Sequence, residues 1–327
     1  MLGSVHDAED ALQETLLRAW RGVDGLREAE SGRAWLYAIA TNVCRTELAR
    51  RAKRVLPHDF GPSVDGNTPP GQPITESVWI EPYPDEAIGL PPGKASPEAT
   101  YEQHEAIELA FVALLQHLPA NQRATLLLRE VLGFSAQETA TALSTSVASV
   151  NSALQRARAT VTSRAPARTQ QATLRALGDR SLRDLVTRYV AAWERCDVDA
   201  FAGLLATDAS FAMPPLSTWY TPRDAVITWA RNFSINNEWK WRALVTRANA
   251  QPALGFYAWD DASGAFLPFA LNVLSLQGEL VSDVTAFIVR ATGAPEPDAY
   301  IRFPDRPMDE RQLAGTFARF GLPNQVA

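Results

Sequence analysis

A proline-rich segment between residues 55 and 99 restricts the fold of this chain more than any other feature. It contains ten prolines, at positions 57, 62, 69, 70, 73, 82, 84, 91, 92 and 97. Because proline lacks an amide hydrogen and clashes with the preceding helical turn, no long helix or central strand can cross this segment. We therefore predict a linker. Its aromatic stretch, with Trp79, Ile80 and Tyr83, is expected to dock on a folded part of the protein.

The linker divides a chain of 327 residues, which is longer than one compact domain usually is. A second break is predicted at residues 164–181, where the sequence is polar and basic. After it, tryptophans become frequent and strand patterns begin. We expect three folded units, at residues 1–54, 100–166 and 181–327, with residues 55–99 as the main linker.

The net charge of −6 excludes a uniformly basic coat protein for nucleic acid, but it says nothing about local basic surfaces. The two cysteines, Cys44 and Cys196, fall in different predicted units, which is typical of a reducing compartment without disulfides. The N-terminus lacks a signal-peptide pattern, and no run approaches the roughly 18 apolar residues of a membrane span. We expect a cytoplasmic protein without membrane contact.

The first unit is predicted to be helical throughout. Ser4 and Asp7 form a capping-box pattern that opens a helix, and apolar residues then recur at helical spacing. Asp7, Asp10 and Glu14 form an acidic stripe on the opposite face. A second helix is predicted from about residue 33 to 54, and its C-terminal end is strongly basic.

Residues 118–161 show the pattern of a helix-turn-helix. Pro119 fits the first turn of a helix that ends at Gly133, and Ser135 with Glu138 is a capping box that opens a short second helix. A Ser-Thr-Ser turn and a longer helix from residue 147 to 161 follow. The polar face of the longer helix could read base edges in the major groove through Ser149, Asn151, Ser152, Gln155, Arg156 and Arg158.

An ordinary pair of packed helices with a solvated polar face would give a similar pattern. The local charge favours DNA binding, because residues 139–178 contain five arginines and no acid within an acidic protein.

Three stretches, "DAEDALQETLLRAW", "RAWLYAIATNVCRTELARR" and "QRATLLLREVLGFSAQETATAL", occur in that order. They resemble regions two and four of extracytoplasmic-function sigma factors of the sigma-70 family. The linker motif "WIEPYPD" and the C-terminal extension are similar to the sigma G-type subgroup. The resemblance implies that the chain binds core RNA polymerase and promoter DNA and directs promoter-specific transcription initiation.

The resemblance also implies roles for individual residues. Core polymerase would be bound by the first helix, through Asp7, Asp10, Gln13, Glu14 and Trp20. The promoter's −10 element would be engaged and opened by the second helix, through Trp35, Tyr37, Asn42, Arg45, Arg50 and Arg51. The −35 element would be read by the polar face of the helix at 147–161, and the linker would thread toward the polymerase active-site channel.

The chain departs from the family's pattern in three places. A further helix is expected before "MLGS", so Met1 is expected to be an internal methionine or a misassigned start, leaving the N-terminal unit poorly ordered or aggregation-prone. The loop "LREAESGRAW" is acidic where the family has an aromatic and serine-rich run. Ser144 stands at a turn position where glycine is common.

The C-terminal unit is predicted to be α+β, with helices first and strands near residues 241–248, 253–259, 266–276 and 280–289. It resembles the SnoaL-like polyketide cyclase and ketosteroid isomerase cone, in which a curved sheet surrounds an apolar pocket. The whole chain is thus expected to be multidomain, with an all-α region two and an all-α helix-turn-helix region four followed by the α+β SnoaL-like cone. A pocket, left open for an unidentified small ligand, would be lined by Met213, Trp219, Tyr220 and Trp229, which the pattern also allows as plain core.

Enzymes of the SnoaL-like fold transfer protons with a pocket aspartate, often paired with histidine or tyrosine. All four histidines (6, 58, 104 and 117) lie outside residues 181–327, so no Asp–His pair is expected there. Asp208, Asp283, Tyr220 and Tyr257 remain as candidates, but we predict no catalytic residue, metal or cofactor. The resemblance implies instead that the extension acts in cis on the sigma regions.

Two other functions compete with a sigma factor. A ligand-responsive helix-turn-helix regulator that is not a polymerase subunit would explain Gln155, Arg156 and a pocket, but it leaves the acidic first helix without a role. An isomerase or cyclase with a fused DNA-binding segment would need a catalytic dyad that the sequence does not offer. Binding to core polymerase separates a sigma factor from both.

Overall fold

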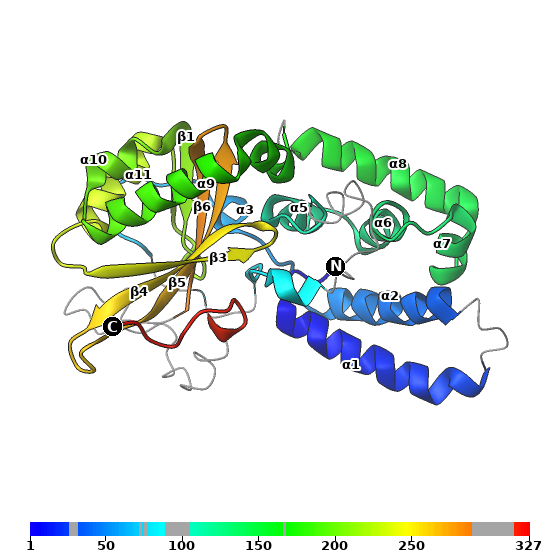
Figure 1. The fold of residues 1–327 in the computed structure, drawn as a ribbon. Coiled ribbons are helices and arrows are strands. Elements are labelled where there is room, and N and C mark those ends of the chain that lie inside the picture. Colours follow the sequence, from blue (N-terminus) through cyan, green and yellow to red (C-terminus); the bar gives the residue numbers. More distant parts are fainter. Residues whose placement is uncertain (26–31, 72–73, 75–77, 89–104, 166–167, 290–316) are drawn as a thin grey trace. The chain divides into compact units, whose positions relative to one another are not determined.

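The computed structural model describes residues 1–25, 32–71, 74, 78–88, 105–165, 168–289 and 317–327 (Figure 1). By their internal contacts these residues form two compact units. The first unit contains the described residues of 1–55, 77–81 and 95–167, and the second contains those of 56–76, 82–94 and 168–327. The described residues of the linker are therefore shared between the two units.

The first unit begins with two packed helices, α1 (Val5–Gly22) and α2 (Gly32–Arg50), with the short turn η1 (Val23–Gly25) after α1. The Ser4 hydroxyl accepts a hydrogen bond from the Asp7 amide, so the predicted N-cap is confirmed. Ala11 of α1 and Val43 of α2 are buried together. The larger apolar side chains of α1 are exposed, namely Leu12, Leu16, Leu17 and Trp20.

The helix-turn-helix follows the predicted order of caps and turns. Its helices are α5 (Leu109–Leu115), α6 (Ala120–Leu126) with its continuation η4 (Leu127–Val131), α7 (Ala136–Ala142) and α8 (Val147–Arg164). Both hydrogen bonds of the Ser135–Glu138 capping box are present, and Ser146 caps α8. Gly133 and Ser144 have φ values of 70° and 51° at the two turns. Val150, Leu154 and Ala157 of α8 are buried, as the periodicity predicts.

The second unit is a mixed sheet with helices on one of its faces (Figure 1). Its helices are α9 (Gln170–Glu194), α10 (Val198–Ala202) and α11 (Arg223–Trp229), which continues as η5 (Ala230–Ser234). Its strands are β1 (Leu205–Ala212), β2 (Trp219–Tyr220), β3 (Trp241–Ala248), β4 (Gln251–Asp260), β5 (Ala265–Gln277) and β6 (Leu280–Ile288). Their order is β2-β1-β6-β5-β4-β3, and β1 and β6 run parallel. The predicted α+β fold is confirmed.

The break predicted at residues 164–181 is wrong over most of its length. α9 begins at Gln170, where the Thr169 hydroxyl accepts a hydrogen bond from the Ala172 amide. Gly178, with a φ of 75° and a ψ of 158°, is non-helical and divides α9 into two helical segments at a kink. The segment before the kink is the helix that the sequence pattern does not indicate.

Two further segments pack against the sheet of this unit. Linker residues 56–71, including the short helix α3 (Pro57–Phe60), contact β1, β2 and β6. The C-terminal residues 317–327 contact β4 and β5, where Phe317 and Leu322 pack against the bare backbone of Gly255. The tail thus packs back on the fold, as its apolar residues suggest.

The aromatic part of the linker is docked, as predicted. In the first unit Trp79 and Ile80 are buried, and Trp79 forms a β-bridge with Val55. In the second unit the Tyr83 backbone exchanges hydrogen bonds with Asn249, and the turn η3 (Asp85–Ile88) brings Asp85 to Arg247.

Candidate functional site

One face of α8 presents the residues predicted to read DNA. Val150, Ala153, Leu154 and Ala157 hold the opposite face in the core, which fixes the rotation of the helix. The exposed face brings together Ser149, Asn151, Ser152, Gln155, Arg156 and Arg158. Arg158 forms an exposed ion pair with Glu130 at 2.6 Å, so its guanidinium is already partly engaged. Gln155 and Arg156 offer the free donors and acceptors that base edges require.

The basic end of α2 borders an open groove. Asn42, Arg45 and Arg50 line it together with Ala120 and Asn121 at the start of α6. The Arg45 guanidinium donates to the Asn42 side-chain oxygen at 3.3 Å. Three of the six residues predicted for the −10 element are thus brought to one surface, where their charges suit a phosphate backbone.

The aromatic residues predicted for the −10 element are half-buried. The Trp35 ring lies against Gly22 at the end of α1. The Tyr37 ring meets the Phe134 ring edge-on, with centroids 5.3 Å apart. Arg33 lies over the same Phe134 ring and donates to the Leu132 carbonyl at 2.7 Å. In this state Tyr37 packs against the helix-turn-helix instead of facing solvent.

Asp7 does not belong to the exposed acidic stripe in which the sequence pattern places it. Its carboxylate is buried and accepts hydrogen bonds from the Arg54 Nε and Nη2 at 3.0 and 2.6 Å. Arg51 also pairs with it. Asp7 lies in the first turn of α1 on the side that faces the end of α2, so the basic tail of α2 neutralises it. Asp10, Gln13 and Trp20, by contrast, are exposed, and Glu14 pairs with Arg18 on the helix surface.

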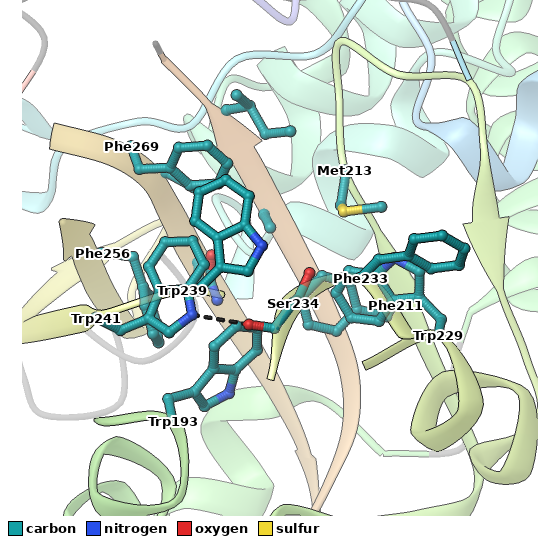
Figure 2. A pocket seen from close by; sticks show the side chains of 14 residues that line it. Trp193, Phe211, Met213, Trp229, Phe233, Ser234, Trp239, Trp241, Phe256 and Phe269 are labelled. Carbon is teal, nitrogen blue, oxygen red and sulfur yellow. Dashed lines mark hydrogen bonds between the residues drawn. The ribbon is translucent and has the colours of Figure 1, made fainter. Parts of the chain in front are cut away.

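An apolar cavity lies between the sheet and the helices of the second unit (Figure 2). Its volume is about 30 Å³, and its lining is predominantly aromatic. The residues that line it are Trp193, Phe211, Met213, Trp229, Phe233, Ser234, Trp239, Trp241, Phe256, Phe269, Ala270, Asn272, Ala286 and Ile288. Ala270 and Asn272 alternate along β5, and Ala286 and Ile288 alternate along β6, which is the pattern that a strand with one inward face imposes.

Two of the four residues predicted for the pocket do not line it. Met213 and Trp229 do, but Trp219 and Tyr220 contact the linker. The Tyr220 ring stacks with the Trp229 ring, with centroids 5.3 Å apart, and the Tyr220 hydroxyl donates to the Thr68 carbonyl at 2.9 Å. Trp219 donates to the Gly61 carbonyl at 2.8 Å. These contacts were not predicted, because no local sequence pattern shows that the linker packs on the sheet.

Residues 181–327 contain no histidine, as noted above, but the linker brings one to Asp283. His58 Nε2 lies 3.2 Å from the Asp283 carboxylate and 3.3 Å from the Ser210 hydroxyl. The Ser210 hydroxyl donates to the same carboxylate at 2.5 Å. Both partners meet one nitrogen of the imidazole, whereas a nucleophilic relay needs them on opposite nitrogens. The cluster therefore fits an ionic clamp better than a catalytic triad.

The surroundings of His58 and Asp283 favour the charged form of both side chains. Burial lowers the pKa of His58, but the hydrogen bond and charge of Asp283 outweigh burial, and the pKa is raised overall. Burial raises the pKa of Asp283, but the His58 contact and hydrogen bonds from Ser210 and Thr285 outweigh it, and the pKa is lowered overall.

A close approach of backbones completes the docking of the linker. A methyl group at Gly66 would lie 2.3 Å from the Ala225 carbonyl oxygen of α11 and 2.7 Å from the Thr228 side chain. Only glycine therefore fits at this position. At Gly61, by contrast, a methyl group would meet nothing within 4 Å.

Some predicted features lie outside the described residues, namely the acidic loop at 26–31 and the linker residues 72–73, 75–77 and 89–104. Within the described part of the chain, no group of three or more His, Cys, Asp or Glu side chains could hold a metal ion. No described helix is long and apolar enough to cross a membrane.

Two segments of the chain match models of known protein families. Residues 1–54 match the model of sigma-70 region 2, and residues 108–161 match the model of sigma-70 region 4. Two such regions, joined by a linker that begins at the end of the first, make this chain a sigma factor of the sigma-70 family.

A relative identifies the branch of that family. The ECF RNA polymerase sigma factor SigG of Mycobacterium tuberculosis is 40% identical over 292 residues, which cover 88% of this chain and 76% of that protein. The chain therefore belongs to the extracytoplasmic-function sigma factors. The RNA polymerase sigma-H factor of Pseudomonas aeruginosa is 31% identical over 159 residues, or 47% of this chain and 72% of that protein.

A solved structure has a similar fold over most of the chain. The crystal structure of the extracytoplasmic function sigma factor SigJ of Mycobacterium tuberculosis matches with a TM-score of 0.54 and 20% identity. The match covers 88% of this chain and 89% of that chain. The order of helical sigma regions followed by a mixed-sheet domain is thus common to both.

Proposed function

We propose that this chain binds core RNA polymerase in the cytoplasm and directs it to promoters, reading the −35 element with α8 and the −10 element with α2. The observation that carries the proposal is the α8 face, whose exposed polar and basic residues stand in a chain that also holds a second basic helix. A ligand-responsive regulator would need the α8 face but not the second basic helix, α2.

Within this function, the exposed part of α1 contacts polymerase. Asp10, Gln13, Glu14 and Trp20 are available for a basic protein surface, whereas Asp7 supports them by fixing α1 on α2. On α2, Asn42, Arg45 and Arg50 contact DNA at the groove, and Arg51 divides its charge between Asp7 and Glu47.

Co-purification with core polymerase, followed by run-off transcription, tests this function. The purified chain should bind core and start transcription at a promoter that core alone cannot use. Arg156→Ala and Gln155→Ala should each lower discrimination of the −35 sequence about tenfold, since one bidentate base contact is worth roughly 1 to 3 kcal/mol. Arg164→Ala, at the end of α8, is the matched control. A regulator would instead bind the duplex unaided and fail in the run-off assay.

We further propose that the C-terminal domain acts in cis by holding the linker. Four contacts support this role: the His58–Asp283 pair, the Trp219–Gly61 and Tyr220–Thr68 hydrogen bonds, and the close packing of Gly66 on α11. A linker held on this sheet cannot at the same time extend toward the polymerase channel.

Gly66→Ala provides the test, because its methyl group cannot be accommodated at the Ala225 carbonyl. It should undock the linker and change the rate of run-off transcription, whereas Gly61→Ala should leave the rate unchanged. Deleting the domain is a cruder alternative, and the cut belongs before Thr169 because α9 begins at Gln170. Equal rates for the two glycine variants and the parent chain would contradict action through the linker.

We also propose that the C-terminal domain is not an enzyme. Among the described residues, the cavity lining contains no carboxylate, histidine, lysine, tyrosine or cysteine. Proton transfer needs such a group within hydrogen-bond reach of its substrate. Asp283 and Tyr220 are occupied by the linker, and Tyr257 donates to the Pro323 carbonyl of the tail.

A further inference from the structure

The tip of the β3–β4 hairpin in the second unit is a buried turn. Asn249 and Ala250 connect the two strands, and both have a φ of 55°, the left-handed conformation that a two-residue hairpin turn of this kind requires. Asparagine tolerates this conformation, but alanine is strained in it because of its Cβ. Loops normally lie at the surface, whereas Asn249 is 1% exposed and Ala250 is fully buried. The turn is therefore covered by a segment that packs on it.

That segment consists of the linker residues Tyr83, Pro84 and Asp85. The Asn249 amide donates to the Tyr83 carbonyl at 2.8 Å, and the Tyr83 amide donates to the Asn249 side-chain oxygen at 2.9 Å. Pro84 is buried and forms an antiparallel bridge with Ala248. The linker thus pairs with the hairpin through its backbone, as a peptide does when it is added to the edge of a sheet.

A carboxylate completes the contact. Asp85 accepts a hydrogen bond from the Ala250 amide at 2.7 Å and, through its other oxygen, from the Arg247 Nε at 3.0 Å. Arg247 also donates to the Ala250 carbonyl at 3.0 Å. The amides of both turn residues therefore have an acceptor in the linker. Because a buried amide without an acceptor is costly, the turn is satisfied only when a peptide lies on it.

These contacts specify the chemistry of the peptide. The backbone pairing with Asn249 requires an extended segment. The buried position of Pro84 suits a residue that has no amide hydrogen to leave unpaired. Arg247 and the Ala250 amide together select a carboxylate, because hydrogen bonds to a charged acceptor are roughly twice as strong as those to a neutral one.

We propose that the hairpin tip, residues 247–250, is a peptide-binding site for an extended segment in which an aspartate follows a proline. In the free chain the linker fills this site in cis, and a segment of the same chemistry from another protein binds there when the linker leaves. The binding is non-covalent. This inference deepens the proposed action of the C-terminal domain in cis, and it rests on that action for its consequence in transcription.

Peptide titration of the full chain, without polymerase, tests the site. The probe is an end-capped, fluorescently labelled peptide of residues 81–86, EPYPDE, followed by fluorescence anisotropy. The linker competes with the probe in the parent chain, and Asp85→Ala weakens this competitor. The probe should therefore bind to the Asp85→Ala chain about tenfold more tightly than to the parent chain.

Glu86→Ala is the matched control, because Glu86 is the next residue and its side chain is exposed. The Glu86→Ala chain should bind the probe as the parent chain does. Equal affinities of the Asp85→Ala chain and the parent chain, or no binding to either, would overturn the site.

A changed probe tests the recognition of the carboxylate. The same peptide with Asp85→Asn should bind to the Asp85→Ala chain about tenfold more weakly, since a charge-assisted hydrogen bond is lost. Undiminished affinity would overturn the selection of an aspartate.

A variant of the turn locates the probe. In the Asp85→Ala chain, Asn249→Gly keeps the left-handed turn and removes the side-chain acceptor, so the probe should bind about fivefold more weakly. Arg242→Ala, at an exposed position of β3 away from the tip, should leave the affinity unchanged. An unchanged affinity in Asn249→Gly, with an unchanged melting temperature, would place the probe elsewhere and overturn the assignment.

Run-off transcription separates this inference from the proposed action in cis. Asp85→Ala should change the run-off rate in the same direction as Gly66→Ala, because both variants loosen the linker. If the probe binds as expected and the rate does not change, the peptide site stands and the action in cis fails.

Discussion

Asp7 shows how one buried charge can organise a helical unit. Its carboxylate meets Arg54, whose side chain is 8% exposed, and Arg54 also donates to the Trp79 carbonyl at 2.7 Å. The pair thus fastens α1, the end of α2 and the linker together. Removing one partner of such a pair leaves the other buried and uncompensated, which is costlier than the pair's own net contribution.

We expect Asp7→Ala to lower the free energy of unfolding of the first unit by about 3 kcal/mol for this reason. Asp10→Ala, at an exposed position of the same helix, should change it by less than about 0.5 kcal/mol. Thermal unfolding of the full chain measures both. A polymerase-binding defect in Asp10→Ala with an intact melt would separate recognition from folding, whereas a stable Asp7→Ala would contradict the anchoring role.

The His58–Asp283 pair makes linker docking dependent on pH. The pKa of His58 is raised from 6.5, so its contribution is complete below that value and is lost as the pH rises through the raised pKa. The pKa of Asp283 is lowered from 3.8, so its contribution is present above that value and is lost as the pH falls through the lowered pKa. Docking should be strongest between these limits.

Hydrogen exchange measures this dependence, because the Val64 amide donates to the Trp219 carbonyl and the Gly71 amide donates to the Thr218 hydroxyl. After correction for the intrinsic rate, protection of both amides should fall between pH 6 and pH 9, because His58 loses its charge as the pH rises through its raised pKa. Asp283→Asn should remove the dependence, and Asp208→Asn, at an exposed site of β1, should keep it. If protection changed equally with pH in the two variants, the His58–Asp283 pair would not be the cause of the pH dependence.

Residue roles set by periodicity were predictable, and those set by distant contacts were not. The exposed face of α8 follows from the spacing of its apolar residues. The Asp7–Arg54 contact joins residues 47 positions apart, and His58 meets Ser210 across 152 positions. Neither contact leaves a local pattern, because the sequence does not state which surfaces will meet.

At the scale of the element, the turn between α7 and α8 combines an unfavourable residue with a favourable cap. Ser144 has a φ of 51°, a left-handed conformation that costs a residue with a Cβ roughly 1 kcal/mol. Ser146 accepts the Ser149 amide at 3.2 Å and starts the recognition helix.

Substitutions two positions apart should therefore have opposite signs. We expect Ser144→Gly to stabilise the first unit by about 0.5 to 1 kcal/mol, and Ser146→Ala to destabilise it by about 1 kcal/mol. Chemical denaturation followed by circular dichroism measures both changes. A destabilising Ser144→Gly would mean that the entropy of the unfolded glycine chain outweighs the relieved strain.

The start of α9 escaped prediction for a physical reason. Its first turn carries Gln170 and Gln171, which read as linker residues but are buried in the structure. Gln170 exchanges two hydrogen bonds with the Leu276 backbone, and Gln171 donates to the Ala250 carbonyl at 2.8 Å. These glutamines form hydrogen bonds with backbone groups of the sheet. In a hydropathy pattern, a buried glutamine of this kind cannot be told from one that is exposed to water. The strands themselves were found because their residues alternate locally.

At the scale of the whole molecule, the two sigma regions of the first unit are in contact. Tyr37 and Arg33 of α2 pack on Phe134, beside the start of α7. The −10 and −35 elements, about 25 base pairs apart, are separated by about 85 Å along B-form DNA. Helices in contact cannot reach both, so the first unit has to open when the protein works as a sigma factor.

Fluorescence energy transfer measures this opening. With Cys44 and Cys196 replaced by alanine, dyes attached at Ala49→Cys on α2 and Ser163→Cys on α8 should show high transfer in the free chain. Core polymerase should lower the transfer strongly, because the DNA elements set the distance between the helices. An unchanged efficiency in a transcribing complex would contradict the opening.

Trp229 connects two surfaces of the second unit. Its ring lines the cavity and is also stacked with the ring of Tyr220, which holds the linker through Thr68. Coupling between two equilibria that share a residue is reciprocal, so a change in the packing of this ring that alters linker docking must itself be altered, by the same free energy, when the linker leaves. A single indole then carries information in both directions between the cavity and the linker.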